Sequence, residues 1–199
     1  MILLLSACAS VQVKRVQPLA ETADAPYSSV LVVSLFKSFD IRRYLEADIV
    51  TQLEARGIKA VASTSMMNTR TPVTRETFLA MVESQGSDSV LVTQLVDLET
   101  EAKLRDSRPE STYNVWPTYY YNVWNVELTE YVAPQSLELK QSIVLATQMY
   151  SVATKEPVWG IETSTKISTN YNTRGGTAFI MDEAKKMVSY LSRDGLLAN

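Results

Sequence analysis

The chain contains no histidine, and its 199 residues include a single cysteine. Histidine is the commonest general base near neutral pH and the commonest protein ligand of transition metals. Its absence removes the basis for Ser-His or Cys-His catalysis and for zinc or copper sites of the usual kind. An enzyme would then need paired carboxylates or a Ser-Lys pair, and no such motif is evident. We therefore predict a non-enzymatic protein with no cofactor and no metal.

The sequence also lacks long hydrophobic runs and any concentration of positive charge. No apolar run reaches the roughly 20 residues that a membrane-spanning helix needs. The formal net charge is −3 and the basic residues are scattered, so the electrostatic surface of a nucleic-acid-binding protein is missing. Hydrophobic residues make up 46% of the chain and charged residues 21%, which is typical of a globular protein. This length indicates one domain.

The one cysteine, Cys8, closes the sequence LSAC at residues 5–8, behind the apolar residues 1–4. This pattern resembles the lipobox of bacterial lipoproteins, whose cysteine sulfur receives a diacylglycerol before the preceding peptide is removed. A thiolate is the side-chain nucleophile best suited to that transfer, and small residues fit a peptidase cleft. The resemblance implies a lipid anchor, palmitate for example, at Cys8. The alternative is an ordinary buried cysteine in an apolar amino-terminal strand.

Ala9 stands where many enteric lipoproteins that stay in the inner membrane carry Asp. By resemblance to that sorting rule, we expect the periplasmic face of the outer membrane. The residues before Cys8 include no charged one, whereas a signal peptide has a basic start and an apolar stretch of roughly 7–15 residues. We therefore expect the true start codon to lie upstream, and residues 1–7 to be the remnant of a signal peptide.

Hydrophobic periodicity predicts the order β-α-β-α-β, then an antiparallel β-hairpin and a C-terminal helix. Such an order indicates a single-domain, two-layer α/β sandwich with a mixed sheet of about five strands. Asp40 and Thr74 are the expected helix N-caps, and Gly57 and Gly86 the expected helix ends. The predicted strands are 30–35, 58–61, 90–96, 137–149 and 159–167, and the predicted helices are 41–56, 75–85 and 177–191.

The domain organisation follows from the same patterns. Residues 8–27 contain two prolines among small and polar residues and are expected to form a lipidated, flexible tether. Residues 28–199 are expected to form the α/β domain, with an aromatic-rich insertion at about 104–134.

Several stretches together resemble one group of envelope proteins. They are the LSAC pattern, the strand 30–35, LEARGI at 53–58, GSDSVLV at 86–92 and PVW at 157–159. The group comprises bacterial outer-membrane lipoproteins and periplasmic modules with the anticodon-binding-like α/β fold. It includes the amino-terminal domain of TolB, curli-secretion lipoproteins, lipoprotein activators of peptidoglycan synthases and other lipoproteins of this layout. The resemblance implies a binding or assembly module whose partner is another envelope protein or a glycan.

Two alternatives to a binding module stay open. One is an oligomeric component associated with secretion or a pore, and the other is a cell-wall enzyme based on carboxylates. Curli-secretion lipoproteins carry two insertions that form membrane-spanning hairpins, with about 9–11 residues per strand. Only the segment 104–134 is long enough here, so a pore is disfavoured. The oligomeric state is not predicted.

The segment 113–131 holds five of the ten tyrosines and two of the three tryptophans. Aromatic side chains with polar tips are enriched at protein interfaces and at lipid headgroups. One interpretation is a protruding ribbon that grips a partner, and the other is an ordinary strand that extends the sheet. The residues expected to contact a partner are Trp116, Tyr119, Tyr120, Tyr121 and Trp124.

Two groups of charged residues have ordinary structural interpretations that we prefer to ligand binding. Asp97, Glu99 and Glu101 alternate along a predicted strand and indicate a solvated strand face more than a cation site. Arg42 and Glu46 have the i,i+4 spacing of an ion pair on a helix surface.

We predict that the mature protein begins at Cys8 and carries a lipid there. The thiol is the only one in the chain, so a Cys8→Ser variant should lose the modification completely. Intact-mass analysis of the membrane fraction, after expression behind a functional lipoprotein signal peptide, measures both species. A soluble, unmodified wild-type protein that still begins with Met1 would contradict the prediction.

Overall fold

A computed structural model describes residues 11–18, 25–67, 73–102, 113–118, 123–128, 139–168 and 175–198. For residues 98–102, 113–118, 123–128, 139–141, 167–168 and 175–178 it describes the backbone alone. The strands are β1 (Val11–Pro18), β2 (Ser29–Leu35), β3 (Lys59–Ala62), β4 (Ser89–Ala102), β5 (Tyr113–Thr118), β6 (Val123–Leu128), β7 (Leu139–Ser151) and β8 (Pro157–Ser168). The helices are α1 (Phe39–Glu54), the 3-10 turn η1 (Ser63–Ser65), α2 (Arg75–Gln85) and α3 (Gly175–Arg193).

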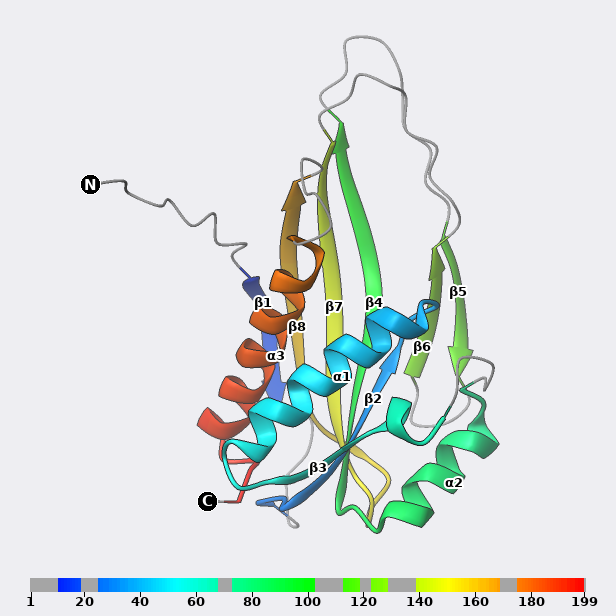
Figure 1. The fold of residues 1–199 in the computed structure, drawn as a ribbon, viewed down its shortest axis with the longest axis vertical. Coiled ribbons are helices and arrows are strands. Elements are labelled where there is room, and N and C mark those ends of the chain that lie inside the picture. The colour runs from blue at the N-terminus through cyan, green and yellow to red at the C-terminus, as the bar shows by residue number, and fades with distance from the viewer. Residues whose placement is uncertain are drawn as a thin grey trace, which may run out of the picture.

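Six of these strands form one mixed sheet in the order β1-β8-β7-β4-β2-β3 (Figure 1). Strand β2 is parallel to both β3 and β4, because α1 and α2 carry the chain back between them. The remaining neighbours, β4 with β7, β7 with β8 and β8 with β1, are antiparallel. The predicted α/β class is confirmed, as is the order β-α-β-α-β, hairpin and C-terminal helix.

The helices pack on the sheet according to the alternation of side chains along its strands. On β2, Val30 and Val32 face a core shared with α1 and α3, whereas Leu31 and Val33 face α2 on the other side. Both sets are fully buried, which explains why the run 30–35 is apolar at nearly every position. Figure 1 shows α1 and α3 lying across one face of the sheet. The larger core therefore lies between that face and these two helices.

Two of the four predicted helix ends, Thr74 and Gly86, are confirmed, whereas α1 ends at Glu54 with Ala55 as its C-cap, before the predicted Gly57. Thr74 caps α2 in a capping box, and α2 ends at Gly86, whose φ of +59° suits a residue without a Cβ atom. The prediction that Asp40 caps α1 is wrong. The cap is Ser38, whose hydroxyl accepts a hydrogen bond from the Ile41 N–H at 3.4 Å. Asp40 is the second residue of the helix, where an acidic side chain still interacts favourably with the helix dipole.

Residues 11–18, which the sequence analysis assigned to the flexible tether 8–27, form the edge strand β1. This strand pairs with β8, from Val11 opposite Thr165 to Pro18 opposite Trp159. Its pattern of valines at 11, 13 and 16 loses strict alternation because the ladder shifts between residues 13 and 15. Because of this bulge, the apolar residues of β1 do not alternate as those of a regular strand do, and β1 was not predicted. The sheet therefore has six strands where about five were predicted.

Hydrophobic contact integrates β1 into the domain. Val13 and Val16 are half-buried and pack against the main core, whereas Gln12 is exposed. We predict that replacing both valines with Ala lowers the free energy of unfolding by about 1–2 kcal/mol, since each change removes partly buried methyl groups. Gln12→Ala serves as the matched control and should change stability little. Chemical denaturation measures all three, and an unchanged double variant would indicate that β1 is not an integral strand.

Candidate functional site

Glu46 joins three elements at the carboxyl ends of the parallel strands, the region where open α/β sheets commonly bind ligands. The side chain is fully buried and comes from α1. One carboxylate oxygen accepts the backbone N–H of Ser34 in β2 at 2.8 Å, and the other accepts that of Thr64 in η1 at 2.7 Å. The Ser63 hydroxyl donates to the same carboxylate at 2.9 Å. Burial raises the pKa of Glu46, and these hydrogen bonds act in the opposite direction.

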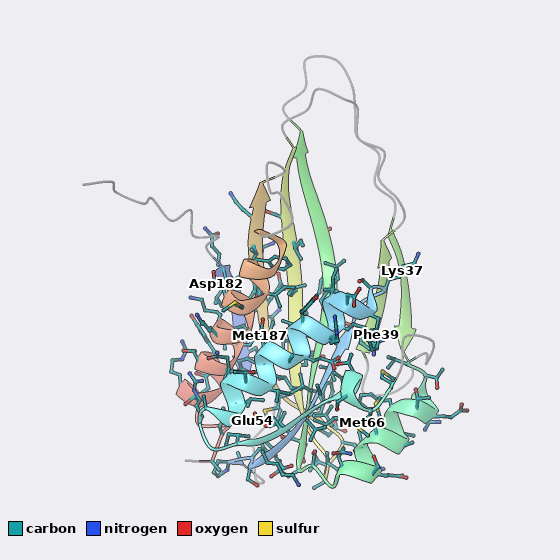
Figure 2. The ribbon with its side chains drawn as sticks, in the orientation of Figure 1. Lys37, Phe39, Glu54, Met66, Asp182 and Met187 are labelled. Carbon is teal, nitrogen blue, oxygen red and sulfur yellow. The ribbon has the colours of Figure 1, made fainter. Side chains whose placement is uncertain are left out.

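Arg42 lies one helical turn before Glu46 and is also buried, with 6% of its surface exposed. Its guanidinium lies 5.7 Å from the centre of the ring of Phe39, the residue at the start of α1 that Figure 2 labels. One terminal nitrogen of the guanidinium contacts the Met67 sulfur at 2.7 Å. The Nε atom has no hydrogen-bond partner among the described residues. Burial lowers the pKa of Arg42, and attraction to the Glu46 carboxylate opposes that shift.

The interpretation of Arg42 and Glu46 as a surface ion pair is therefore wrong. Both residues lie on the stripe of α1 that also carries the buried Ile49 and Leu53, spaced three to four residues apart. That spacing is a signal in the sequence that could have identified them as inward-facing. Their positions are structural ones, and the main-chain donors at the strand ends already occupy the carboxylate.

A second buried carboxylate, Glu183 of α3, was missed by sequence reasoning. It is fully buried and accepts hydrogen bonds from the hydroxyls of Thr163 and Thr165 on β8, at 2.8 and 2.5 Å. Burial raises its pKa, and the two hydroxyls counteract part of that rise. One turn later on α3, Met187 lies between the helix and the sheet (Figure 2). Glu183 thus attaches α3 to β8 in the way that Glu46 attaches α1 to β2.

Two cavities along β1 and β8 are lined by described residues, and neither contains these two carboxylates. The larger has a volume of about 460 Å³, and the smaller, of about 130 Å³, is a shallow hollow on the sheet. The larger is lined by Val16, Pro18, Val158, Trp159, Arg193, Asp194 and Leu196. The smaller is lined by Arg15, Gln17, Ala146, Thr147, Gln148, Gly160, Ile161 and Glu162.

Each cavity has one carboxylate, Asp194 in the larger and Glu162 in the smaller. Asp194 accepts hydrogen bonds from the Trp159 indole at 2.9 Å and from Arg193 at 2.8 Å. Burial opposes its ionisation, but these bonds prevail and lower the pKa of Asp194. A pair of converging carboxylates is absent from both cavities of the described residues. Within the same ranges, no group of three or more His, Cys, Asp or Glu could hold a metal ion.

The predicted partner-binding residues fall partly outside the described part of the chain. Cys8, Tyr119, Tyr120 and Tyr121 lie outside it. The backbone around the two tryptophans forms the β5–β6 hairpin, with position 116 opposite 125 and position 117 opposite 124. This hairpin is a separate two-stranded sheet beside β4 in Figure 1, so the described backbone has the form of a ribbon and not of a strand that extends the main sheet.

The acidic run on β4 keeps the predicted alternation. Residues 97, 99 and 101 pair with residues 144, 142 and 140 of β7, after a shift in the ladder between Leu95 and Asp97. They therefore share one side of the strand backbone, and Asp97 is half-buried.

No protein-family model and no curated protein matches this sequence. Among solved structures, it is similar to the PelC dodecamer from Paraburkholderia phytofirmans, with 11% identity, a TM-score of 0.48 and coverage of 96% of this chain and 100% of that chain. It is similar to lipoprotein GNA1162 from Neisseria meningitidis, with 11% identity, a TM-score of 0.45 and coverage of 82% of this chain and 99% of that chain. It is also similar to a minor lipoprotein from Acinetobacter baumannii, with 11% identity, a TM-score of 0.38 and coverage of 86% of this chain and 97% of that chain. At this level of similarity these structures assign no role to any residue of the chain.

None of the described helices combines the length and the apolar character needed to cross a membrane.

We predict that Glu46→Gln destabilises the protein by about 1–3 kcal/mol at neutral pH, although the two side chains have nearly the same shape. Each carboxylate oxygen accepts a backbone N–H, so the amide NH₂ of Gln would meet a donor and leave a buried N–H unsatisfied. Chemical denaturation measures the change.

Glu183→Gln is the matched control, since its two threonine hydroxyls can accept as well as donate. In the folded wild-type protein the pKa of Glu183 is raised above the ordinary 4.5. The protonated carboxyl therefore stabilises the fold below pH 4.5, and this stabilisation is lost as the pH rises through the folded pKa. The E183Q variant should therefore gain stability relative to wild type as the pH rises above the ordinary carboxyl pKa of 4.5. Equal losses in both variants at neutral pH would contradict the hydrogen-bond argument.

Proposed function

We propose that the protein is a non-enzymatic, lipid-anchored module for binding or assembly on the periplasmic face of the bacterial outer membrane. The observation that carries this proposal is the position of Cys8, the last residue of the LSAC pattern, three residues before the integral strand β1. A diacylated cysteine, with a further acyl chain on its amino group, satisfies the multiple-chain requirement for stable membrane attachment. The folded domain would then be held directly at the bilayer.

The buried carboxylates support a non-enzymatic role. Glu46 and Glu183 have the raised pKa values expected of acid catalysts, but each is fully buried and hydrogen-bonded to groups that hold the fold together. The two cavities along β1 and β8 contain one carboxylate each, whereas glycosidase chemistry needs two at about 5–9.5 Å from each other. A carboxylate-based cell-wall enzyme is therefore the weaker candidate.

The β5–β6 hairpin is the proposed contact surface for an envelope protein or a glycan. Its backbone stands apart from the main sheet, and its sequence concentrates Trp116, Trp124 and neighbouring tyrosines. Tryptophan and tyrosine dominate the binding energy of many interfaces, whereas exposed ion pairs such as Asp40 with Arg43 contribute little.

We predict that replacing Trp116, Tyr120 and Trp124 together with Ala weakens capture of the envelope partner and leaves the melting temperature nearly unchanged. Crosslinking and pull-down of the lipidated protein from envelopes, compared with wild type, measure the capture. Tyr44→Ala is the matched control, because Tyr44 is an aromatic residue of α1 with 46% of its surface exposed.

The stability of the triple variant distinguishes the two interpretations of the aromatic segment. If its free energy of unfolding falls by several kcal/mol, the segment is part of the core, because truncating buried aromatics costs about 3–5 kcal/mol each. The proposal of a binding ribbon would then be wrong.

A further inference from the structure

The distance from Cys8 to the folded domain is short. Cys8 stands three positions before Val11, the first residue of β1, and a chain of that length spans at most about 10 Å. Val11 lies opposite Thr165, near the end of β8. A lipid on Cys8 therefore keeps this end of the sheet within about 10 Å of the acyl attachment point.

The same end of the sheet gathers several strand ends. The last residues of β8 pair with the first residues of β7, at Ser168 and Lys140, and β7 in turn pairs with the last residue of β4. Figure 1 places the start of α3 there as well. We name this the anchor end of the sheet, after Cys8. At the opposite end lies the turn at residues 152–156 between β7 and β8, about 26 Å from Thr165 at the usual rise per strand residue.

Exposed side chains near the anchor end suit a lipid surface. Lys14 is exposed on β1, and a lysine is attracted to anionic headgroups. Met181, in the first half of α3, exposes 47% of its surface to solvent. Its neighbour Asp182, labelled in Figure 2, is half-buried. Strand β1 is the edge strand of the sheet among the described residues, and it carries the exposed Arg15, which favours water over the bilayer interior.

We propose that the lipidated protein stands on the membrane by the anchor end of its sheet, with the strands directed away from the lipid surface. This inference rests on the proposed lipidation of Cys8 and adds the orientation of the domain. It places the cavity around Trp159 and Asp194 on the side that faces away, because Pro18 opposite Trp159 lies about 23 Å along β1 from Val11. A partner that enters this cavity would approach from the periplasm.

The chain allows a direct test, because its only thiol is consumed by the lipid. Single cysteines introduced by Lys166→Cys and Ala153→Cys, both at exposed positions, can be labelled with a fluorescent bimane. The lipidated proteins are placed in phosphatidylethanolamine and phosphatidylglycerol vesicles that contain a lipid with a nitroxide headgroup. We expect several-fold stronger quenching at position 166, at the anchor end, than at position 153, in the distant turn.

Lengthening the tether provides a second measurement. A Gly-Ser segment of about 16 residues inserted between Ser10 and Val11 has a root-mean-square length of about 22 Å and should release the orientation. Quenching at position 166 should then fall towards that at position 153. The same segment added after Asn199 is the matched control and should leave the difference intact.

The outcomes separate this inference from the proposed function. Equal quenching at both positions of a lipidated protein, as expected of a domain lying flat along β1, would overturn the orientation alone. A protein whose mass shows no lipid on Cys8 would overturn the proposed function, and the orientation with it.

Discussion

The carboxylate of Glu46 sets the relation between helix α1 and the sheet. It is fully buried, and its two oxygens accept backbone N–H groups from β2 and from the turn η1 that follows β3. A charge or a polar group in such a place is tolerated only when donors surround it, so the helix, the strand end and the turn must be correctly placed together. The leucine and isoleucine side chains of α1 then complete the core between the helix and the sheet. Glu183 gives α3 a second attachment, to the hydroxyls of β8. Helices α1 and α3 together cover one face of the sheet (Figure 1).

Under the proposed function, the amino-terminal strand would link this scaffold to the cell envelope. Strand β1 lies at the edge of the sheet, pairs with β8 and contributes two half-buried valines to the core. A lipid attached three residues before it would therefore act on a rigid element and not on a long, flexible chain. With a lipid on Cys8, the short connection would limit the positions that the domain can take at the membrane. The proposed anchoring and the proposed orientation would then depend on each other, whereas a flexible tether extending to residue 27 would have separated them.

Local patterns in the sequence predict those parts of the fold that depend on residues close together in the chain. The order of strands and helices was predictable because apolar residues recur with the periods of the elements that they form, as on β2 and on α3. The capping of α2 by Thr74 was predictable because a hydroxyl followed by a suitable side chain three residues later acts locally. Strand β1 was missed because a bulge interrupts its alternation, and Asp40 was predicted where Ser38 is the cap because both residue types cap helices. Arg42 and Glu46 were assigned to the surface because charged residues are rarely buried.

The sequence by itself determined the α/β class and the succession of elements, and it carries the LSAC pattern that resembles a lipobox, since each of these depends on residues close together in the chain. The tertiary structure decided what depends on residues far apart. Ser34, Glu46 and Thr64 meet only when β2, α1 and η1 pack, and Glu183 meets Thr163 and Thr165 only when α3 lies on β8. The same holds for β1, whose partner strand begins about 140 residues later. A backbone donor or a strand edge has no signature of its own in the sequence, so its partner becomes known only when the chain is folded.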